Sequence, residues 1–253
     1  MKLQNKPLQP NSLQQLAPDL WIANQPLRFL GLSVGTRMTV IRLADGRLVV
    51  ISPIALTPEL TTQLDRLGSI AYQIAPNRYH HLFAQAFQQQ YPQAEFWGAI
   101  GLQEKRPDLK IEHVITAEVG EIGTDILYRQ FLGLSVPGTT LSGLGKPDPI
   151  NEVVFYHKPS RTLIITDIAF HFDETNAWET RLVGKLIGGY KALQPTLLEK
   201  WYLTDRALVE RSIRAVLEWD FDRVIMAHGS IIETNGKAML KAGYEWLLDK
   251  QLD

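Results

Sequence analysis

The 253-residue sequence contains no cysteine. This absence excludes disulfides, zinc–thiolate sites, iron–sulfur clusters and a cysteine nucleophile. The chain also has almost no excess charge, because 26 Lys and Arg stand against 27 Asp and Glu, for a formal charge of -1. Binding to a phosphate backbone needs clustered Lys and Arg, so this balance argues against nucleic acid as a main partner.

Long hydrophobic runs are missing as well. The longest apolar stretch, around Leu48–Leu56, is interrupted by Ser52 and Pro53 and is far shorter than the ~20 residues that cross a bilayer. The opening segment MKLQNKPLQPNSLQQL has no apolar run of signal-peptide length and no small-residue cleavage site. We therefore expect a soluble cytoplasmic protein without a transmembrane segment. No pattern in the sequence indicates an oligomeric state.

The residues that are present are typical of a globular domain, with 45% hydrophobic and 21% charged side chains. Residues 1–17, rich in Gln, Asn and Pro, predict an irregular lead-in to a single domain over residues 18–253. Patterning and turn signals predict strands at 38–43, 48–51, 70–75, 95–99, 153–156, 162–166 and 223–227, and helices beginning at Thr57-Pro58, after His81, at Thr204 and near Gly236. Hairpins lie between the alternating segments, which favours a layered α/β sandwich over a regular parallel sheet.

Three of these strands end abruptly in polar residues. Asn77, His80 and His81 follow the strand at 70–75, Asp167 follows 162–166, and His228 follows 223–227. Loops converge at the strand ends of one sheet edge, and imidazole and carboxylate are the ligands that a Zn-type cation takes when cysteine is absent. The sequence therefore predicts a four-coordinate metal site made of His80, His81, Asp167 and His228.

Each of these residues also has a structural interpretation. The His80-His81 pair fits one buried, hydrogen-bonded histidine beside one surface histidine. Asp167 fits an N-cap of a following helix, and His228, which precedes a glycine, fits a turn. Their joint occurrence after three separate strands favours the metal site.

The order of motifs resembles the metallo-β-lactamase-like hydrolase superfamily, and more closely an uncharacterised branch found in phototrophic and other bacteria and in plants. The resemblance rests on Asp45-Gly46 and on the segments 75–81 (APNRYHH), 137–140 (PGTT), 151–155 (NEVVF), 160–167 (SRTLIITD) and 221–229 (FDRVIMAHG). It covers most of residues 18–248. It implies a four-layer αββα sandwich with metals at one edge.

The departures from the superfamily pattern indicate a reduced metal site. When the superfamily loop His-x-His-x-Asp-His is laid over 76–81, its first two histidines fall on Pro76 and Arg78, and its Asp falls on His80. A third expected histidine falls on Thr139, and an early strand-end Asp is replaced by Ser52. The resemblance thus implies loss of the first metal site. Because Arg78 places a permanent positive charge there, a second cation would be repelled, and we expect one metal at most.

The resemblance implies a mechanism for a single ion. One divalent metal, with Zn favoured over Fe or Mn, would polarise a small-molecule substrate and lower the pKa of a water. Asp167 is the candidate base, and Arg78 the candidate clamp for an anionic group of the substrate. Asn77 and Glu152 are candidates for orienting ligands or substrate, although Glu152 also fits a structural salt bridge, and Tyr79 fits either a site residue or a core aromatic.

A separate amphipathic pattern lies within residues 168–200, which we expect to form a helical lid or insertion. Trp178, Leu182, Leu186 and their neighbours recur at helical spacing, with basic residues between them. The pattern fits a helix lying on the core or covering the site. It also fits a helix that docks on a membrane surface or a partner.

Three functions are compatible with these features. The first is a mononuclear metal-dependent hydrolase. The second is a degenerate member of the fold that holds no metal and binds an anionic ligand or a protein without turnover. The third is a non-haem iron oxidoreductase, because two histidines and one carboxylate are also an iron-binding set.

Overall fold

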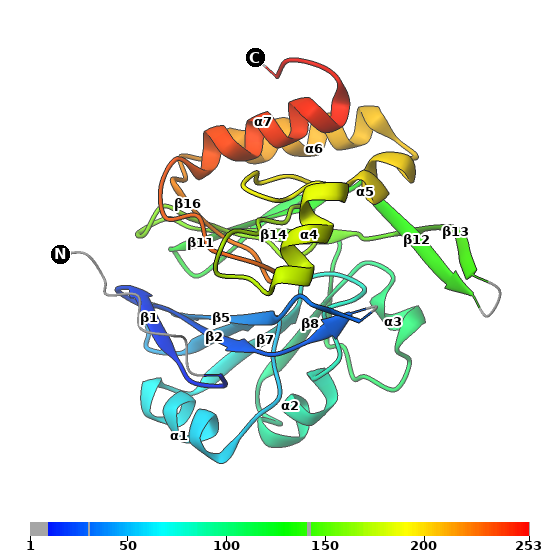
Figure 1. Cartoon of the computed structure of the whole chain (residues 1–253). Coiled ribbons are helices and arrows are strands. Elements are labelled where there is room, and N and C mark those ends of the chain that lie inside the picture. Colours follow the sequence, from blue (N-terminus) through cyan, green and yellow to red (C-terminus); the bar gives the residue numbers. More distant parts are fainter. Residues whose placement is uncertain (1–9, 30, 141–142, 253) are drawn as a thin grey trace.

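The computed structural model describes residues 10–29, 31–140 and 143–252. Two β-sheets lie face to face, with α1 and α2 outside the first sheet and α6 and α7 outside the second (Figure 1). This is the αββα sandwich that the resemblance implies, and it agrees with the layered α/β sandwich predicted from the patterning. No helix in these residues is both long enough and apolar enough to span a bilayer.

The first sheet has seven strands in the order β1-β2-β5-β6-β7-β8-β9, and the second has five in the order β10-β11-β14-β15-β16. The strands of the first sheet are β1 (Gln14–Ala17), β2 (Leu20–Gln25), β5 (Thr36–Arg42), β6 (Leu48–Ile51), β7 (Ile70–Ala75), β8 (Glu95–Ala99) and β9 (His113–Ile115). Those of the second are β10 (Val119–Ile122), β11 (Ile126–Phe131), β14 (Glu152–His157), β15 (Thr162–Ile164) and β16 (Arg223–Ile225).

Two hairpins stand apart from the sheets: β3 (Arg28–Phe29) with β4 (Leu32–Ser33), and β12 (Ser135–Thr140) with β13 (Gly143–Pro149). The helices are α1 (Pro58–Leu67), α2 (Ala84–Gln90), α3 (Leu102–Lys105), α4 (Trp178–Ile187), α5 (Leu197–Trp201), α6 (Arg206–Leu217) and α7 (Gly236–Leu248). The chain therefore carries more strand than the sequence predicts, mainly between residues 113 and 149.

Alternation along the strands produces the layers. In β2, Leu20 and Ile22 belong to the core between the two sheets, whereas Trp21 and Ala23 pack on the side covered by α1 and α2. Successive side chains of a strand point to opposite faces, so a strand that is apolar on both faces lies between two layers. The second sheet is covered in the same way, because α6 and α7 pack on its outer core.

Local sequence signals explain the helix boundaries. Thr57 Oγ1 accepts the Leu60 N–H at 3.2 Å, and Pro58 occupies the first helical position of α1, as predicted. Gly68 ends α1 against the turn at 44–47, where a Cβ would lie 2.3 Å from the Gly46 carbonyl oxygen. The cap of α6 is one residue later than predicted: Asp205, not Thr204, accepts the Leu208 N–H at 2.8 Å.

Other boundaries also differ from the prediction. The expected irregular lead-in contains β1, which pairs with β2; residues 1–9 of the lead-in lie outside the described part. Strand β15 ends at Ile164 instead of residue 166, because the backbone N–H groups of Thr166 and Asp167 turn to the carboxylate of Glu152. The predicted lid region contains α4 and the first residues of α5.

Candidate metal centre

The candidate site lies where the strand ends of both sheets meet. Loops that follow β7, β15 and β16 carry His80, Asp167 and His228, respectively, and Ser52 directly follows β6. β6 and β7 are parallel, as are β15 and β16, so each pair presents its carboxyl ends at one edge. The fold thereby brings together His80 and His228, which are 148 positions apart in the sequence.

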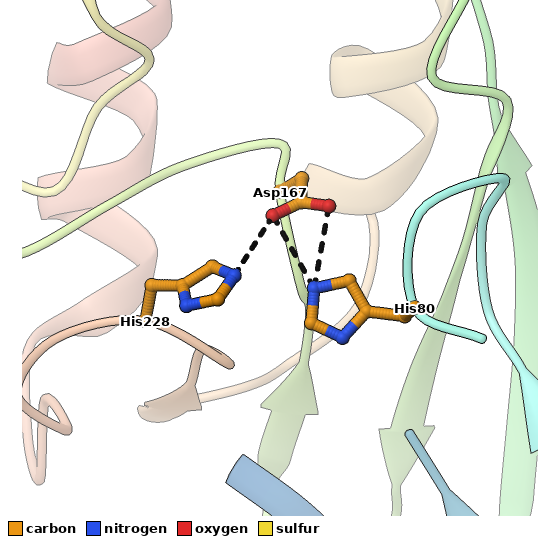
Figure 2. A group of neighbouring side chains, drawn as sticks. All are labelled: His80, Asp167 and His228. Atoms are coloured by element: carbon orange, nitrogen blue, oxygen red, sulfur yellow. Dashed lines mark hydrogen bonds and ion pairs between the residues drawn. The ribbon is translucent and has the colours of Figure 1, made fainter. Parts of the chain in front are cut away.

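The imidazoles of His80 and His228 converge on the carboxylate of Asp167 (Figure 2). The Nε2 atom of His80 lies 3.3 Å from Asp167 Oδ2, and that of His228 lies 3.3 Å from Oδ1. One ligand atom from each residue lies within 4.8 Å of the other two. The three side chains are 6%, 14% and 13% exposed in chain order, so the group is partly shielded and still open to a small solute.

A backbone carbonyl fixes the orientation of His228. Its Nδ1 lies 2.6 Å from the oxygen of Gly35, and a carbonyl oxygen only accepts, so Nδ1 carries the proton. In the neutral ring, Nε2 then presents a lone pair to Asp167. A lone pair facing a carboxylate oxygen is unfavourable unless a proton or a cation lies between them, which makes this a position for positive charge.

His80 has a similar outer contact with Ser52. Its Nδ1 lies 2.6 Å from the hydroxyl of Ser52, which is buried at the end of β6. The hydroxyl can accept the Nδ1–H, and Nε2 is then free to act as a ligand. Ser52, which replaces the strand-end Asp of the superfamily pattern, is thus hydrogen-bonded to the side of the His80 ring that faces away from Asp167.

Asn77 links Asp167 to the loop that carries His80. Its side-chain nitrogen donates to Asp167 Oδ2 at 2.7 Å and to Glu152 Oε2 at 3.1 Å. Its side-chain oxygen accepts the backbone N–H groups of Tyr79 and His80 at 2.7 and 2.9 Å. Asn77 is completely buried, which leaves no surface for a substrate. Of its two predicted roles, orienting a ligand or orienting substrate, its contacts fit the first, because they fix Asp167 relative to the His80 loop.

Glu152 is likewise completely buried. It accepts the N–H of Thr166 at 2.6 Å, the hydroxyl of Thr166 at 2.5 Å and the N–H of Asp167 at 2.7 Å. Burial, reinforced by the charge of Asp167, raises the pKa of Glu152 to about 7. This burial leaves no surface for a substrate, which corrects that part of the prediction. The contacts fit the ligand-orienting part, because the carboxylate holds the strand end that carries Asp167.

Asp167 keeps its negative charge despite its surroundings. Burial acts to raise its pKa, but the adjacent rings of His80 and His228 outweigh burial and hold the pKa well below its ordinary value. The site therefore supplies an ionised oxygen ligand beside two ring nitrogens.

Arg37 is a supporting residue that sequence reasoning missed. It is 7% exposed, and its guanidinium donates to the carbonyl oxygens of Met226 at 2.5 Å and Gly229 at 3.0 Å, on either side of His228. Its Nε donates to Asn24 Oδ1 at 2.8 Å. Burial lowers its pKa to about 10. Arg37 thus fixes the His228 loop of the second sheet onto β5 of the first.

His81 does not join the group, which corrects its assignment as a fourth ligand. Its Nδ1 lies 2.7 Å from a guanidinium nitrogen of Arg106. Burial, followed by the charges of Arg106 and Lys105, lowers the pKa of His81 to about 4. Adjacent side chains in this turn point in different directions, so only one ring of the pair reaches Asp167.

Arg78 is already engaged elsewhere. It forms an ion pair with Asp148 and donates to the carbonyl oxygens of Pro149 at 3.2 Å and Gly101 at 3.3 Å. Because Asp148 neutralises its charge, the prediction of Arg78 as a free clamp or catalytic residue is not supported by its contacts. The side chain of Thr139 lies outside the described part of the structure.

The donor set fits one divalent cation. Two ring nitrogens and one carboxylate oxygen are the three protein ligands typical of a catalytic zinc site, which keeps a position open for water or substrate. The Gly35 carbonyl gives His228 the tautomer that a metal ligand needs, and the Ser52 hydroxyl is compatible with the same tautomer in His80. Because His81 is not part of the group, the fourth position of a tetrahedral ion would be left for water.

Comparison with solved structures identifies the fold as that of metallo-β-lactamases. A crystal structure of the DIM-1 metallo-β-lactamase exposed to ceftazidime has a TM-score of 0.64 at 10% identity, covering 96% of this chain and 99% of that one. The metallo-β-lactamase from Pontibacter korlensis has a TM-score of 0.60 at 13% identity, with coverage of 95% and 99%. The mono-zinc form of FIM-1 from Pseudomonas aeruginosa has 0.59 at 9% identity, with coverage of 95% and 94%.

The chain belongs to the family described as domain of unknown function DUF4336, whose model matches residues 18–183. The match includes His80 and Asp167 and ends before His228. No curated protein sequence matches the chain. The structural likeness, at these identities, establishes the fold and leaves the chemistry to the residues of the site.

Proposed function

We propose that this protein is a mononuclear metal-dependent hydrolase in which His80, Asp167 and His228 hold one divalent metal ion. The main support is that the Nε2 atoms of His80 and His228 converge on the carboxylate of Asp167. Their Nδ1 atoms are already hydrogen-bonded to Ser52 and Gly35, respectively. Zinc is the first choice because the donors are nitrogen and oxygen and the open position is compatible with tetrahedral coordination. Iron and manganese are the alternatives.

The proposed chemistry divides between the ion and the chain. A bound divalent ion would polarise an ester, amide or phosphate oxygen and lower the pKa of a water. His80 and His228 hold their rings with Nε2 inward. Asp167 supplies the ionised oxygen that accepts a proton, and Asn77 Nδ2 orients that carboxylate from 2.7 Å. Arg78 has no part in this assignment because it is paired with Asp148.

Metal analysis of the purified protein tests the proposal. We expect about one ion per chain after metal-replete expression, falling several-fold in His228→Ala and Asp167→Asn. His81→Ala is the matched control, because it removes the neighbouring imidazole that lies outside the group and is expected to retain the metal. A metal content that none of the group's substitutions changes would contradict the site.

A substrate panel of esters, amides and phosphoesters tests the activity. Turnover by the wild type should fall by roughly a hundredfold or more in His228→Ala and persist in His81→Ala. Metal binding without turnover on any member of the panel would favour a ligand-binding protein on this fold. Consumption of dioxygen by the Fe²⁺-loaded protein would favour the iron oxidoreductase, which uses the same two-histidine, one-carboxylate set.

A further inference from the structure

Helix α4 packs with small residues inward and exposes three of its large apolar residues. Its buried residues are Thr180 and Gly184. Trp178, Leu182 and Leu186 recur every four residues on the opposite side and are 69%, 51% and 68% exposed. We call these three side chains the α4 stripe. A surface helix normally turns such a stripe toward the core. Here the three side chains face away from it, so the expectation of a helix that lies on the core through this stripe is not met.

Specific contacts hold α4 in this orientation. Thr180 Oγ1 donates to the backbone oxygen of Ser33 in β4 at 2.8 Å. Gly184 lies so close to Phe172 that an added Cβ would be 3.3 Å from its ring. The contacts of α4 therefore keep the stripe exposed. Rotating the helix to turn the stripe inward would break the hydrogen bond from Thr180 to Ser33 and push leucine side chains against Phe172.

The surroundings of the stripe are apolar and cationic. Hairpin β3–β4, to which α4 is bound, carries another exposed large apolar side chain, Phe29, at 61%. Among the charged side chains of α4 and this hairpin, Arg28, Arg181 and Lys185 outnumber Glu179. In the described part of the chain, none of these three cations forms an ion pair with a carboxylate: Arg28 donates to the carbonyl oxygen of Gly31 at 2.8 Å, and Lys185 Nζ lies 4.8 Å from the centroid of the Tyr190 ring. The helical positions of Arg181 and Lys185 border the stripe on one side.

We propose that the α4 stripe, together with hairpin β3–β4, docks the protein on the surface of a membrane that contains anionic lipid. Apolar side chains that enter the interface, a tryptophan among them, and cations without a carboxylate partner beside them are the features of a helix that lies in the plane of a bilayer. Three side chains on one convex helix are small for a stable protein interface, which buries about 800 Å² per partner. The excess of cations favours an anionic surface over a second copy of the same patch.

The docking face connects structurally to the candidate metal centre without depending on it. Phe172, beneath Gly184, stacks on Phe170 with ring centroids 6.3 Å apart, and Phe170 stacks on His228 at 6.2 Å. Membrane attachment would therefore hold the site close to the lipid surface. The attachment itself needs no metal, and the experiment below separates it from the proposed hydrolase function.

Vesicle sedimentation of the purified full-length protein tests the docking. We compare vesicles of phosphatidylcholine alone with vesicles of phosphatidylcholine and phosphatidylglycerol in equal parts. The wild type should sediment with the mixed vesicles, less so as salt increases, and with a blue shift of tryptophan fluorescence. Leu182→Gln combined with Leu186→Gln, and separately Trp178→Ala, should each weaken binding on the order of tenfold.

The matched control is Trp201→Ala, because Trp201 on α5 is 71% exposed and lies outside the stripe. It should bind vesicles like the wild type. His228→Ala, which removes one of the three candidate metal ligands, should do so as well. Arg181→Glu combined with Lys185→Glu should lose the preference for anionic vesicles. Since Trp178, Leu182, Leu186 and Trp201 are exposed, circular dichroism of the variants at these positions should match that of the wild type.

Three results would overturn the proposal. One is absence of binding to both kinds of vesicle. Another is binding that Trp178→Ala and the double leucine variant leave unchanged. The third is self-association seen by light scattering and abolished by the leucine substitutions, without vesicle binding, which would make the stripe a contact between copies of this chain.

Discussion

Two neutral oxygens determine how the histidines of the site present themselves. The hydroxyl of Ser52 and the carbonyl of Gly35 each lie 2.6 Å from an imidazole Nδ1, and both leave Nε2 facing Asp167. At the scale of single residues, therefore, the orientation of the two imidazoles depends on the hydrogen-bond partners of their Nδ1 atoms. Asn77 and Glu152 play the same part for Asp167, from positions fully shielded from solvent.

Replacing Ser52 by Ala should weaken metal binding by about 10- to 100-fold, because His80 loses the outer hydrogen bond that holds the orientation of its ring. The affinity for Zn²⁺ is measured by competition with a chromophoric chelator. Ser160→Ala is the matched control, since its hydroxyl lies 2.7 Å from Nδ1 of His157 in the same kind of contact, outside the metal group. Equal losses in the two variants would show that the Ser52 contact has no special role.

The buried His157 should make stability depend on pH. Burial lowers its pKa, whereas in the unfolded chain a histidine titrates near 6.5. Below that pH the unfolded chain takes up a proton that the folded chain resists, so stability present above pH ~6.5 is lost as the pH falls. His157→Gln should therefore lose less stability than the wild type between neutral and mildly acidic pH in urea unfolding. Parallel pH profiles would count against this.

Part of the residue set could be predicted from the sequence. His80, Asp167 and His228 each follow an apolar strand, and that pattern was sufficient to single them out. The pattern could not separate His80 from His81, because the direction of a side chain in a turn is set by tertiary contacts such as that of Arg106 with His81. Arg37 gave no signal, since its partners lie 189 and 192 residues away.

At the scale of elements, the connection between β5 and the loop after β16 gives His228 its place. Arg37 on β5 is buried, and it donates to the carbonyl oxygens of Met226 and Gly229, which flank His228 in the turn. Its three hydrogen-bonded partners are neutral oxygens, so its charge is buried among dipoles instead of a carboxylate. Such an arrangement tolerates little change in the donor geometry.

Arg37→Lys should lower the free energy of unfolding by about 2–4 kcal/mol, because a lysine cannot reach all three acceptors and leaves buried carbonyls without a donor. The variant should also bind Zn²⁺ more weakly than the wild type. Urea unfolding and metal titration measure the two effects. Arg42→Lys, on the same strand but half-exposed and paired with Asp19, should change stability by less than about 1 kcal/mol. Similar losses in both would contradict the role given to Arg37.

Helices were easier to predict than strands, for a local reason. Thr57, Pro58 and Gly68 specify both ends of α1 by themselves. By contrast, β13 (Gly143–Pro149) contains two prolines and pairs only with β12, so nothing in its composition indicates a strand. Its pairing depends on a partner segment, and a partner is not visible in a local window.

At the scale of the whole molecule, the candidate metal group joins the two sheets. His80 comes from a loop of the first sheet, whereas Asp167 and His228 follow strands of the second. A bound ion would therefore act as a cross-link between the halves of the sandwich, in addition to the shared core. The layered arrangement was predictable from hairpins and alternation, but which strand ends come together depends on the packing of the sheets.

Metal should stabilise the folded protein, because the three ligands are gathered only in the native state. Free metal at a hundredfold excess over its dissociation constant contributes about 2.7 kcal/mol, which should raise the melting temperature relative to the chelator-treated protein. The shift should persist in His81→Ala and be largely lost in Asp167→Asn. A shift of the same size in Asp167→Asn would place the stabilising ion elsewhere.

The most direct measurement is anomalous diffraction at the zinc edge from crystals grown with Zn²⁺. We predict one strong peak within about 2.0–2.2 Å of Nε2 of His80, an oxygen of Asp167 and Nε2 of His228. A peak centred on other residues, or none near these three in zinc-saturated crystals, would contradict the metal site on which the proposed function rests.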